Sequence, residues 1–293
     1  MTYLSIAWVS RNDDHGGQLI PRIQAAVDAL DEHMPMFPFE LIFVEWNPPR
    51  DRERLSEAIR FPVGFPVRWI VISPELHQML PNWERFSLYP HLGANVAMRR
   101  AHGKFVLTTT HDIVWSEGMG RAVRAKDFDP GKVYRAARWD GTCDLGAGLS
   151  VAQRIASMEQ AMIRRTEWRE GVFTKSCGDF ILMARDRWHS MRGYAELTEN
   201  GIWLDGLLLH SAIHGGAEQC VIPHPIYHME HDGRGLDIYK TLPHMPRAEY
   251  LVHLAEMRHG KPAPQFNSTD WGMARAGTVY DKKGRAVLIP SGF

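Results

Sequence analysis

Three histidines lie within eight residues in the last third of the chain, and this density is the first sign of chemistry. They are His224, His228 and His231, in a segment interrupted by Pro225 and Gly233. Proline and glycine argue against a regular helix, so the spacing is not that of a helical zinc motif. Histidine is nevertheless a frequent metal ligand. A metal-binding role and a role as packing and surface residues in a turn are equally supported at this point.

Three carboxylates occupy positions at which an acidic side chain could act. Asp112 ends a predicted strand, Asp205 begins a predicted helix, and Asp179 follows Gly178. A carboxylate can bind a divalent cation or accept a proton from a hydroxyl group. The structural alternatives are a turn cap for Asp112, a helix N-cap for Asp205 and an ordinary loop acid for Asp179.

Short apolar runs alternate with amphipathic stretches in the first half of the chain. Strands are predicted at 4–9, 39–45, 67–72 and from 105 to Asp112, and helices at 18–33, 52–59 and 93–101. This alternation predicts an α/β fold with a mostly parallel central sheet flanked by helices. Ligands bind beyond the carboxyl ends of such strands, so residues 10–14, 45–47 and 108–112 are expected to meet at one edge.

The second half of the chain is less regular. Strands are predicted at 133–137 and 180–183, and helices at 151–165 and 203–214. Residues from 241 onward are rich in proline, glycine and arginine and carry few periodic signals, so they are expected to form an extended tail. We therefore expect one domain over residues 1–240 and a C-terminal extension over 241–293 that packs on the core.

The composition excludes several classes of partner. The 293 residues include 34 basic and 34 acidic side chains, and a net charge of zero argues against a nucleic-acid partner. The three cysteines form no CxxC pair, which favours a reducing compartment. The N-terminus does not read as a signal peptide, and no apolar run reaches the roughly 18 residues of a membrane span. A soluble cytoplasmic protein is expected, with a peripheral position at the inner membrane face as the alternative.

A set of short motifs, taken in order, resembles the inverting glycosyltransferases of the family-two type, which have the GT-A fold. The motifs are SRNDDHGG at 10–17, VEWNPP at 44–49, Asn95 ahead of AHGKF at 101–105, THD at 110–112, GDF at 178–180, WLD at 203–205 and YHMEH at 227–231. The resemblance spans roughly residues 4–235. It implies a transferase that moves a sugar from a nucleotide-diphosphate donor, with UDP-sugars favoured, to a hydroxyl group of a glycan or another acceptor. Polysaccharide biosynthesis is the setting that it suggests.

The resemblance also implies a divalent metal ion on the donor pyrophosphate. Asp112 matches the last acid of the family's Asp-x-Asp motif, although Thr110 replaces the first. His228, with His231 next, matches a late histidine that serves as a second ligand. A hard cation neutralises the charge that a pyrophosphate leaving group accumulates. Because an imidazole suits Mn²⁺ better than Mg²⁺, manganese is the expected ion.

The family pattern assigns further roles around this metal. Asp205 matches the general base that takes the proton from the acceptor hydroxyl, and Asp179 is the alternative base or acceptor contact. Ser10, Arg11, Asp13 and Glu45 are expected to hold the nucleotide base and ribose, and Asn95 and Arg99 to lie near the phosphates. The alternatives for these six residues are turn chemistry and a solvated helix face.

Other functions fit the sequence less well. The loop at 11–17 is acidic, unlike the basic glycine-rich loop of nucleotidyltransferases, and it contains no GxGxxG motif of a dehydrogenase. No GxSxG elbow of a serine hydrolase is present. The remaining alternative is a degenerate GT-A domain that binds a nucleotide sugar or glycan without turnover, because Thr110 and Leu204 each replace an acid of the family pattern.

Overall fold

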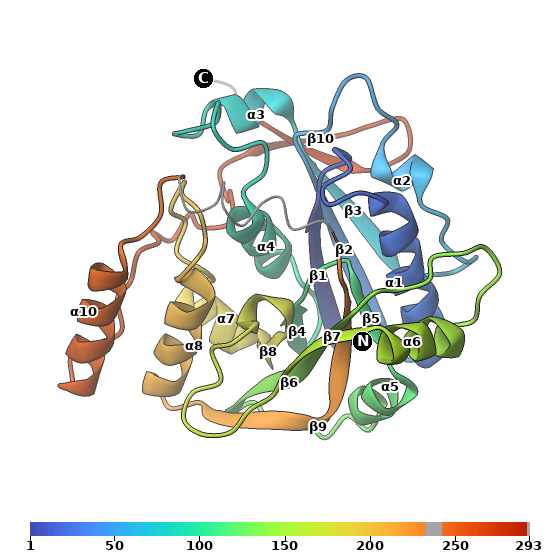
Figure 1. Cartoon of the computed structure of the whole chain (residues 1–293). Coiled ribbons are helices and arrows are strands. Elements are labelled where there is room, and N and C mark those ends of the chain that lie inside the picture. Colours follow the sequence, from blue (N-terminus) through green and yellow to red (C-terminus); the bar gives the residue numbers. More distant parts are fainter. Residues whose placement is uncertain (232–241, 292–293) are drawn as a thin grey trace.

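The computed structural model describes residues 1–231 and 242–291, and its strands form one eleven-stranded sheet (Figure 1). The strand order is β10-β11-β3-β2-β1-β4-β8-β6-β9-β5, and β7 pairs with β6 off this path. The strands are β1 Leu4–Ser10, β2 Phe39–Trp46, β3 Val67–Ile72, β4 Phe105–Thr108, β5 Ile113–Trp115, β6 Lys132–Gly141, β7 Met162–Thr166, β8 Ile181–Ala184, β9 Glu218–Met229, β10 Gly277–Tyr280 and β11 Ala286–Ile289. The helices are α1 Leu19–His33, α2 Leu55–Ala58, α3 Pro74–Gln78, α4 Pro90–Arg99, α5 Glu117–Arg124, α6 Val151–Gln160, α7 Arg185–Met191, α8 Leu204–His214 and α10 Arg247–Arg258, with a 3-10 turn η1 at Cys177–Asp179.

The first half of the chain builds the parallel part of the sheet. Leu4 of β1 pairs in parallel with Phe39 of β2 on one side and with Phe105 of β4 on the other. Strand β2 pairs in parallel with β3. The predicted α/β fold with a mostly parallel central sheet and flanking helices is therefore confirmed. Beyond β4 the sheet is mixed, because β8 is antiparallel to both β4 and β6.

Alternate side chains of the central strands point to opposite faces of the sheet and belong to two apolar layers. Trp8 and Phe43 pack with Ile23 of α1 on one face of the sheet, whereas Ile42 packs with Val96 of α4 on the other. Side chains in a strand alternate between faces, so fully buried strands covered on both sides are apolar at nearly every position. Helices α1 and α4 accordingly lie on opposite sides of β1 and β2 (Figure 1). This arrangement leaves the ends of the strands as the place for polar groups.

The predicted helix over 151–165 is too long. Helix α6 ends at Gln160, and residues from Met162 to Thr166 form strand β7. In the β6–β7 ladder Arg164 lies opposite Asp140, and its Nε atom is 2.9 Å from an oxygen of that carboxylate. Cross-strand pairing of this kind overrides local helical spacing, because tertiary contacts outweigh propensity.

The expectation of an extended C-terminal tail is also wrong. Residues from Arg247 to Arg258 form helix α10, which packs on α8 through an apolar cluster that includes Tyr250 and Leu254. Strands β10 and β11 form an antiparallel pair, and β11 adds to the sheet in parallel with β3. In α10 the buried residues Tyr250, Leu254 and Met257 are spaced by four and three positions, which is a helical period, whereas β10 and β11 have four residues each and are too short to show one. The expected boundary at residues 240 and 241 lies outside the described residues.

None of the helices within residues 1–231 and 242–291 is long and apolar enough to cross a membrane.

Candidate functional site

Asp112, His228 and His231 meet where β4 ends and β5 begins. Asp112 lies directly before β5, and β5 is antiparallel to β9, with Ile113 opposite His228. The backbone N–H of Met229 donates to the carbonyl oxygen of Asp112 at 3.1 Å. The pairing of β5 with β9 therefore brings together residues that are more than one hundred positions apart in sequence.

The side chains of this group converge on one carboxylate. Oδ2 of Asp112 lies 3.7 Å from Nε2 of His228 and 3.3 Å from Nε2 of His231. One potential ligand atom from each residue lies within 4.8 Å of the others. His224, the third histidine of the segment, lies beside Gly118 of α5 instead. The structure thus brings together the three residues predicted to bind metal.

Burial and charge act in opposite directions on this group. Burial alone would raise the pKa of Asp112, but the neighbouring His228 and the contact with His231 hold that pKa well below its usual range. Burial alone would lower the pKa of His228, but Asp112 and Asp140 outweigh it and raise the pKa to about 10. The site therefore stabilises a carboxylate and positive charge beside it.

The donor set fits a divalent transition metal. Oδ1 of Asp112 and Nδ1 of His231 are buried without a hydrogen-bond partner among the described residues. Leaving a buried acceptor unsatisfied is costly, and an ion bound at the carboxylate would satisfy it. One carboxylate and two imidazoles are ligands that Mn²⁺ and similar ions accept, whereas Mg²⁺ prefers oxygen alone.

Arg22 is a basic neighbour of this group that the sequence analysis missed. Its Nη1 atom lies 3.1 Å from Oδ2 of Asp112, and its side chain is 2% exposed. The same guanidinium donates to the carbonyl oxygens of His15 and Gly17 in the loop after β1. An arginine in the first turn of α1, between apolar neighbours, was the available signal for a buried cation.

Asp140 of β6 lies behind His228 and was also missed. Its Oδ1 atom is 3.0 Å from Nδ1 of His228 and 2.7 Å from Nη2 of Arg138. Its Oδ2 atom accepts from Nε of Arg164 at 2.9 Å. The side chain is 1% exposed. Burial would raise the pKa of Asp140, but these partners lower it to about 2. The predicted strand at 133–137 ends before Asp140, whereas β6 extends to Gly141, so no signal in the sequence pointed to a buried acid at this position.

Asp179 belongs to the same network. Arg138 bridges it to Asp140, donating Nη1 to Asp179 and lying with Nη2 beside Asp140. The hydroxyl groups of Thr109 and Thr110 donate to the backbone carbonyl and the carboxylate of Asp179 at 2.6 and 3.4 Å. Burial is the largest influence and raises the pKa of Asp179, although Arg138 acts in the opposite direction. The structure therefore connects Asp179 to the group around Asp112.

Asp205 lies in the first turn of α8 and is not its N-cap, which is Trp203. Its Oδ1 atom is 3.1 Å from Nε2 of His91, near the start of α4. Its carboxylate is 23% exposed, so it is accessible to solvent. A Cβ atom at Gly178 would lie 2.8 Å from Oδ2 of Asp205, so a larger residue at this position would require the carboxylate to shift. The sequence analysis did not identify His91.

The four residues expected to hold the nucleoside lie at the ends of β1 and β2. Ser10 is 1% exposed, and Arg11 donates to the carbonyl oxygen of Asn47 at 2.9 Å and pairs with Asp13 at 3.0 Å. Glu45 is fully buried, accepts from the backbone of Leu55 and pairs with Arg54 at 2.8 Å. The expected edge is therefore formed, but the carboxylate of Glu45 already has protein partners.

The two residues expected near the phosphates are engaged with later parts of the chain. Asn95 is fully buried, exchanges hydrogen bonds with the backbone of Tyr194 and donates to Glu196. Arg99 donates to the carbonyl oxygen of Thr269 at 3.0 Å. These contacts connect helix α4, which covers one face of the sheet, to later segments of the chain. The predicted phosphate roles of Asn95 and Arg99 stay predictions.

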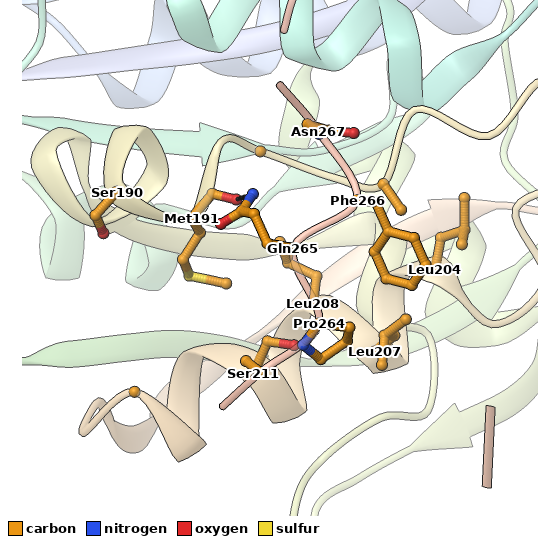
Figure 2. Close-up of a pocket in the computed structure, with 14 residues that line it drawn as sticks. Ser190, Met191, Leu204, Leu207, Leu208, Ser211, Pro264, Gln265, Phe266 and Asn267 are labelled. Carbon is orange, nitrogen blue, oxygen red and sulfur yellow. Dashed lines mark hydrogen bonds between the residues drawn. The ribbon is translucent and has the colours of Figure 1, made fainter. Parts of the chain in front are cut away.

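A cavity of about 190 Å³ lies between α7, α8 and the segment 263–267 (Figure 2). Its lining is mainly apolar and includes Met191, Leu204, Leu207 and Phe266. Within the described part of the chain, none of the predicted site residues lines it.

No protein-family profile matches this chain, and no curated protein matches it. Solved structures do. The chain is similar to the mannosyltransferase PcManGT from Pyrobaculum calidifontis in complex with GDP-Man and Mn²⁺, at 15% identity and a TM-score of 0.51, over 89% of this chain and 65% of that one. It is also similar to S. aureus TarS 1–349 in complex with UDP-GlcNAc, at 13% identity and a TM-score of 0.56, over 90% of this chain and 68% of that one. This chain thus spans about two thirds of each, and it shares the glycosyltransferase fold that the sequence predicts.

Proposed function

We propose that this chain is a metal-dependent glycosyltransferase of the family-two type that uses a nucleotide-diphosphate sugar. The observation that carries the proposal is the convergence of Asp112, His228 and His231 at the carboxyl edge of a sheet with the glycosyltransferase fold. In α/β sheets this edge is where ligands bind. Fold likeness alone would not assign an activity, because one fold hosts many functions.

Asp112, His228 and His231 would hold the cation, and Mn²⁺ suits this mixed set better than Mg²⁺. When bound, such an ion supplies Lewis-acid stabilisation of the departing nucleoside diphosphate. The protein residues fix the position of the donor, with Ser10, Arg11 and the adjoining loop near the nucleoside.

Asp205 is the better candidate for the general base. Its carboxylate is partly exposed and has His91 at 3.1 Å, whereas the carboxylate of Asp179 is buried against Arg138. A base of this kind accepts the proton of the acceptor hydroxyl while that oxygen attacks the anomeric carbon. One direct displacement of this type inverts the configuration at the anomeric carbon. Asp179 then acts through Arg138 on the group around Asp112.

The donor class is proposed from the neighbours and the resemblance together. The solved neighbours were crystallised with GDP-Man, UDP-GlcNAc and UDP, so a nucleotide-diphosphate sugar is the common feature. UDP-sugars are favoured by the resemblance of the sequence motifs. The acceptor is a hydroxyl group of a glycan or a related molecule.

Thermal unfolding against a panel of nucleoside diphosphates tests the proposal. A ligand that binds only the folded state raises the melting temperature by mass action. We expect a rise with one diphosphate in Mn²⁺, loss of that rise in a chelator, and loss in Asp112→Asn. Absence of any shift with every nucleotide, with and without metal, would contradict the proposal.

A degenerate domain that binds nucleotide sugar without turnover is the second candidate. It is favoured by the ion pair of Arg22 with Asp112, which places a protein cation beside the carboxylate that would hold the metal. Release of nucleoside diphosphate from the donor separates the two. Metal-dependent release that is lost in Asp205→Asn supports transfer, whereas binding without release supports the degenerate domain.

A further inference from the structure

The two nitrogen atoms of the His228 ring face two different carboxylates. Nε2 points toward Asp112 at 3.7 Å, and Nδ1 lies 3.0 Å from Oδ1 of Asp140. The strand ladders produce this arrangement, because His228 of β9 pairs with Ile113 of β5 on one side and with Asp140 of β6 on the other. The imidazole therefore lies between the candidate metal group and a second, deeper carboxylate.

Asp140 could serve in either of two ways. Asp140, His228 and Glu230 form a second group of potential ligands within 4.8 Å, which could hold an ion of its own. Alternatively, Asp140 could accept the Nδ1 proton of His228 while Nε2 binds the ion beside Asp112. A single imidazole cannot supply Nε2 to one ion and carry a proton on Nδ1 while also binding a second ion there.

The arginines around Asp140 decide between these roles. Nη2 of Arg138 lies 2.7 Å from Oδ1 of Asp140, and Nε of Arg164 lies 2.9 Å from Oδ2. Both carboxylate oxygens therefore already face a guanidinium, which would repel a divalent cation. Oδ1 of Asp112 and Oδ1 of Asp140 both lack a partner in good hydrogen-bond geometry within the described ranges 1–231 and 242–291. The two carboxylates differ in their charged neighbours, because at Asp112 the guanidinium of Arg22 and both imidazoles make their closest contacts with the same oxygen, Oδ2. Asp140 is therefore the carboxylate that has a guanidinium at each oxygen, and Asp112 has one at Oδ2 only.

We propose that Asp140 is a positioning residue that holds Nδ1–H of His228 and so directs Nε2 to a metal ion at Asp112, and that Asp140, His228 and Glu230 form no second metal site. The inference rests on the metal-dependent function proposed above. Metal-bound histidines commonly donate their second ring N–H to a carboxylate, which sets the tautomer and the ring orientation. The arginine pair fixes the Asp140 carboxylate in turn.

Titration of the full chain with Mn²⁺, followed by the EPR signal of the free ion, tests this role. We expect one Mn²⁺ per chain in the wild type and an affinity about 10- to 100-fold weaker in Asp140→Asn. Asp140→Glu keeps the charge that both arginines require but displaces the oxygen from Nδ1, so it is expected to weaken Mn²⁺ binding while preserving the fold. Glu230→Gln should bind Mn²⁺ as the wild type does.

Glu40 provides a matched control. It is a buried carboxylate paired with Arg68 at 3.0 Å, at the opposite ends of the strands that carry the site. Glu40→Gln should lower stability without changing the affinity for Mn²⁺, so a general loss of stability is distinguished from a loss of ligand orientation. In ¹H–¹⁵N spectra of the Zn²⁺-loaded chain, the Nδ1–H signal of His228 should be present in the wild type and lost or shifted in Asp140→Asn.

Three outcomes would overturn the inference. Equal Mn²⁺ affinity in the wild type and in both Asp140 variants would show that Asp140 has no positioning role. Two Mn²⁺ ions per chain, reduced to one by Glu230→Gln, would establish the second site instead. A wild type that binds no Mn²⁺ would remove the metal site itself, and with it both this inference and the proposed metal-dependent function, whereas either of the first two outcomes leaves that function standing.

Discussion

Nε2 of His91 lies 3.1 Å from Oδ1 of Asp205, joining the start of α4 to the start of α8. Two glycines make room for the pair. A Cβ atom at Gly178 would lie 2.8 Å from Asp205, and one at Gly201 would lie 1.9 Å from Cε1 of His91. The backbone at these two glycines therefore lies close to the carboxylate and the imidazole, which contact each other directly.

This contact predicts separate effects of the two residues on turnover. Asp205→Asn should lower kcat by about 10²- to 10⁴-fold, because it removes the proposed general base. His91→Gln should lower kcat by about tenfold with little change in KM for the donor, because it leaves the Asp205 carboxylate in place but less well oriented. Steady-state assays of nucleoside diphosphate release measure both.

His214→Gln, an exposed histidine at the end of the same helix α8, is the matched control and should retain wild-type kcat. Wild-type kcat in Asp205→Asn would assign the base elsewhere, with Asp179 as the next candidate.

The metal group predicts a graded response to substitution of its histidines. Mn²⁺ at 100 times its dissociation constant should stabilise the wild type by about 2.7 kcal/mol. Asp112→Asn should abolish this stabilisation and His231→Gln should reduce it, because each removes a ligand. His224→Gln should leave the stabilisation by Mn²⁺ unchanged, since His224 lies beside Gly118 and away from the metal group. Unfolding in urea with Mn²⁺ and then with EDTA measures the difference, and equal stabilisation of all variants would refute the ligand set.

Arg22 and a metal ion compete for the same carboxylate. Arg22→Gln should lower the free energy of unfolding of the metal-free chain by about 3 kcal/mol, because it removes the permanently charged partner of a buried carboxylate and leaves the two histidines beside it. The stabilisation by Mn²⁺ should then be larger than in the wild type, since the ion replaces the missing positive charge. Urea unfolding at several Mn²⁺ concentrations tests both parts. A smaller metal effect in Arg22→Gln would indicate that Arg22 supports the ion instead of opposing it.

Glu40 predicts a pH dependence of stability that is independent of the site. Burial would raise its pKa, but hydrogen bonds from Ser5, the backbone of His102 and Arg68 lower it below 4.5. A carboxylate whose pKa is depressed by folding contributes stability above its unfolded pKa and loses it as the pH falls through the folded pKa. Glu40→Gln should therefore lower the free energy of unfolding by about 2 kcal/mol at pH 7.

The difference between Glu40→Gln and the wild type should shrink as the pH falls below 4.5, because the protonated acid resembles glutamine. Urea unfolding of both proteins between pH 7 and pH 3 measures whether this stability difference falls with pH. A difference that stays constant between pH 7 and pH 3 would mean that the charge of Glu40 does not contribute.

The parallel strands could be predicted because their signal is local. Residues at 39–45 and 67–72 were expected to be strands, and β2 and β3 are found over Phe39–Trp46 and Val67–Ile72. Strands covered on both faces are apolar throughout, and the helices between them show the helical period. Asp112 could be recognised for the same reason, since it follows such a strand directly.

The elements of the second half could not be predicted in this way. Strand β9 contains Pro223 and Pro225, which read as interruptions when no partner is known. Its pairing with β6 and β5 stabilises it in spite of them. The sequence predicts β7 as part of a helix and β11 as part of a tail, because the hydrogen bonds of β7 come from β6 and those of β11 from β10 and β3, and none of these pairings is visible locally.

In the candidate site, too, some residues have a local sequence signal and others depend on the pairing of distant segments. Local patterns in the chain were sufficient to specify the α/β architecture, the edge that carries the polar groups, and Asp112 at the end of a strand, whereas the pairing of His228 with Asp112 was implied by the family resemblance. Arg22, Asp140 and His91 could be identified only after distant segments had paired. Their roles depend on contacts such as that of Asp140 with His228, which the parallel register of β6 and β9 creates. Such contacts leave no periodic trace in the chain, because a single polar side chain facing another across a sheet has no local pattern.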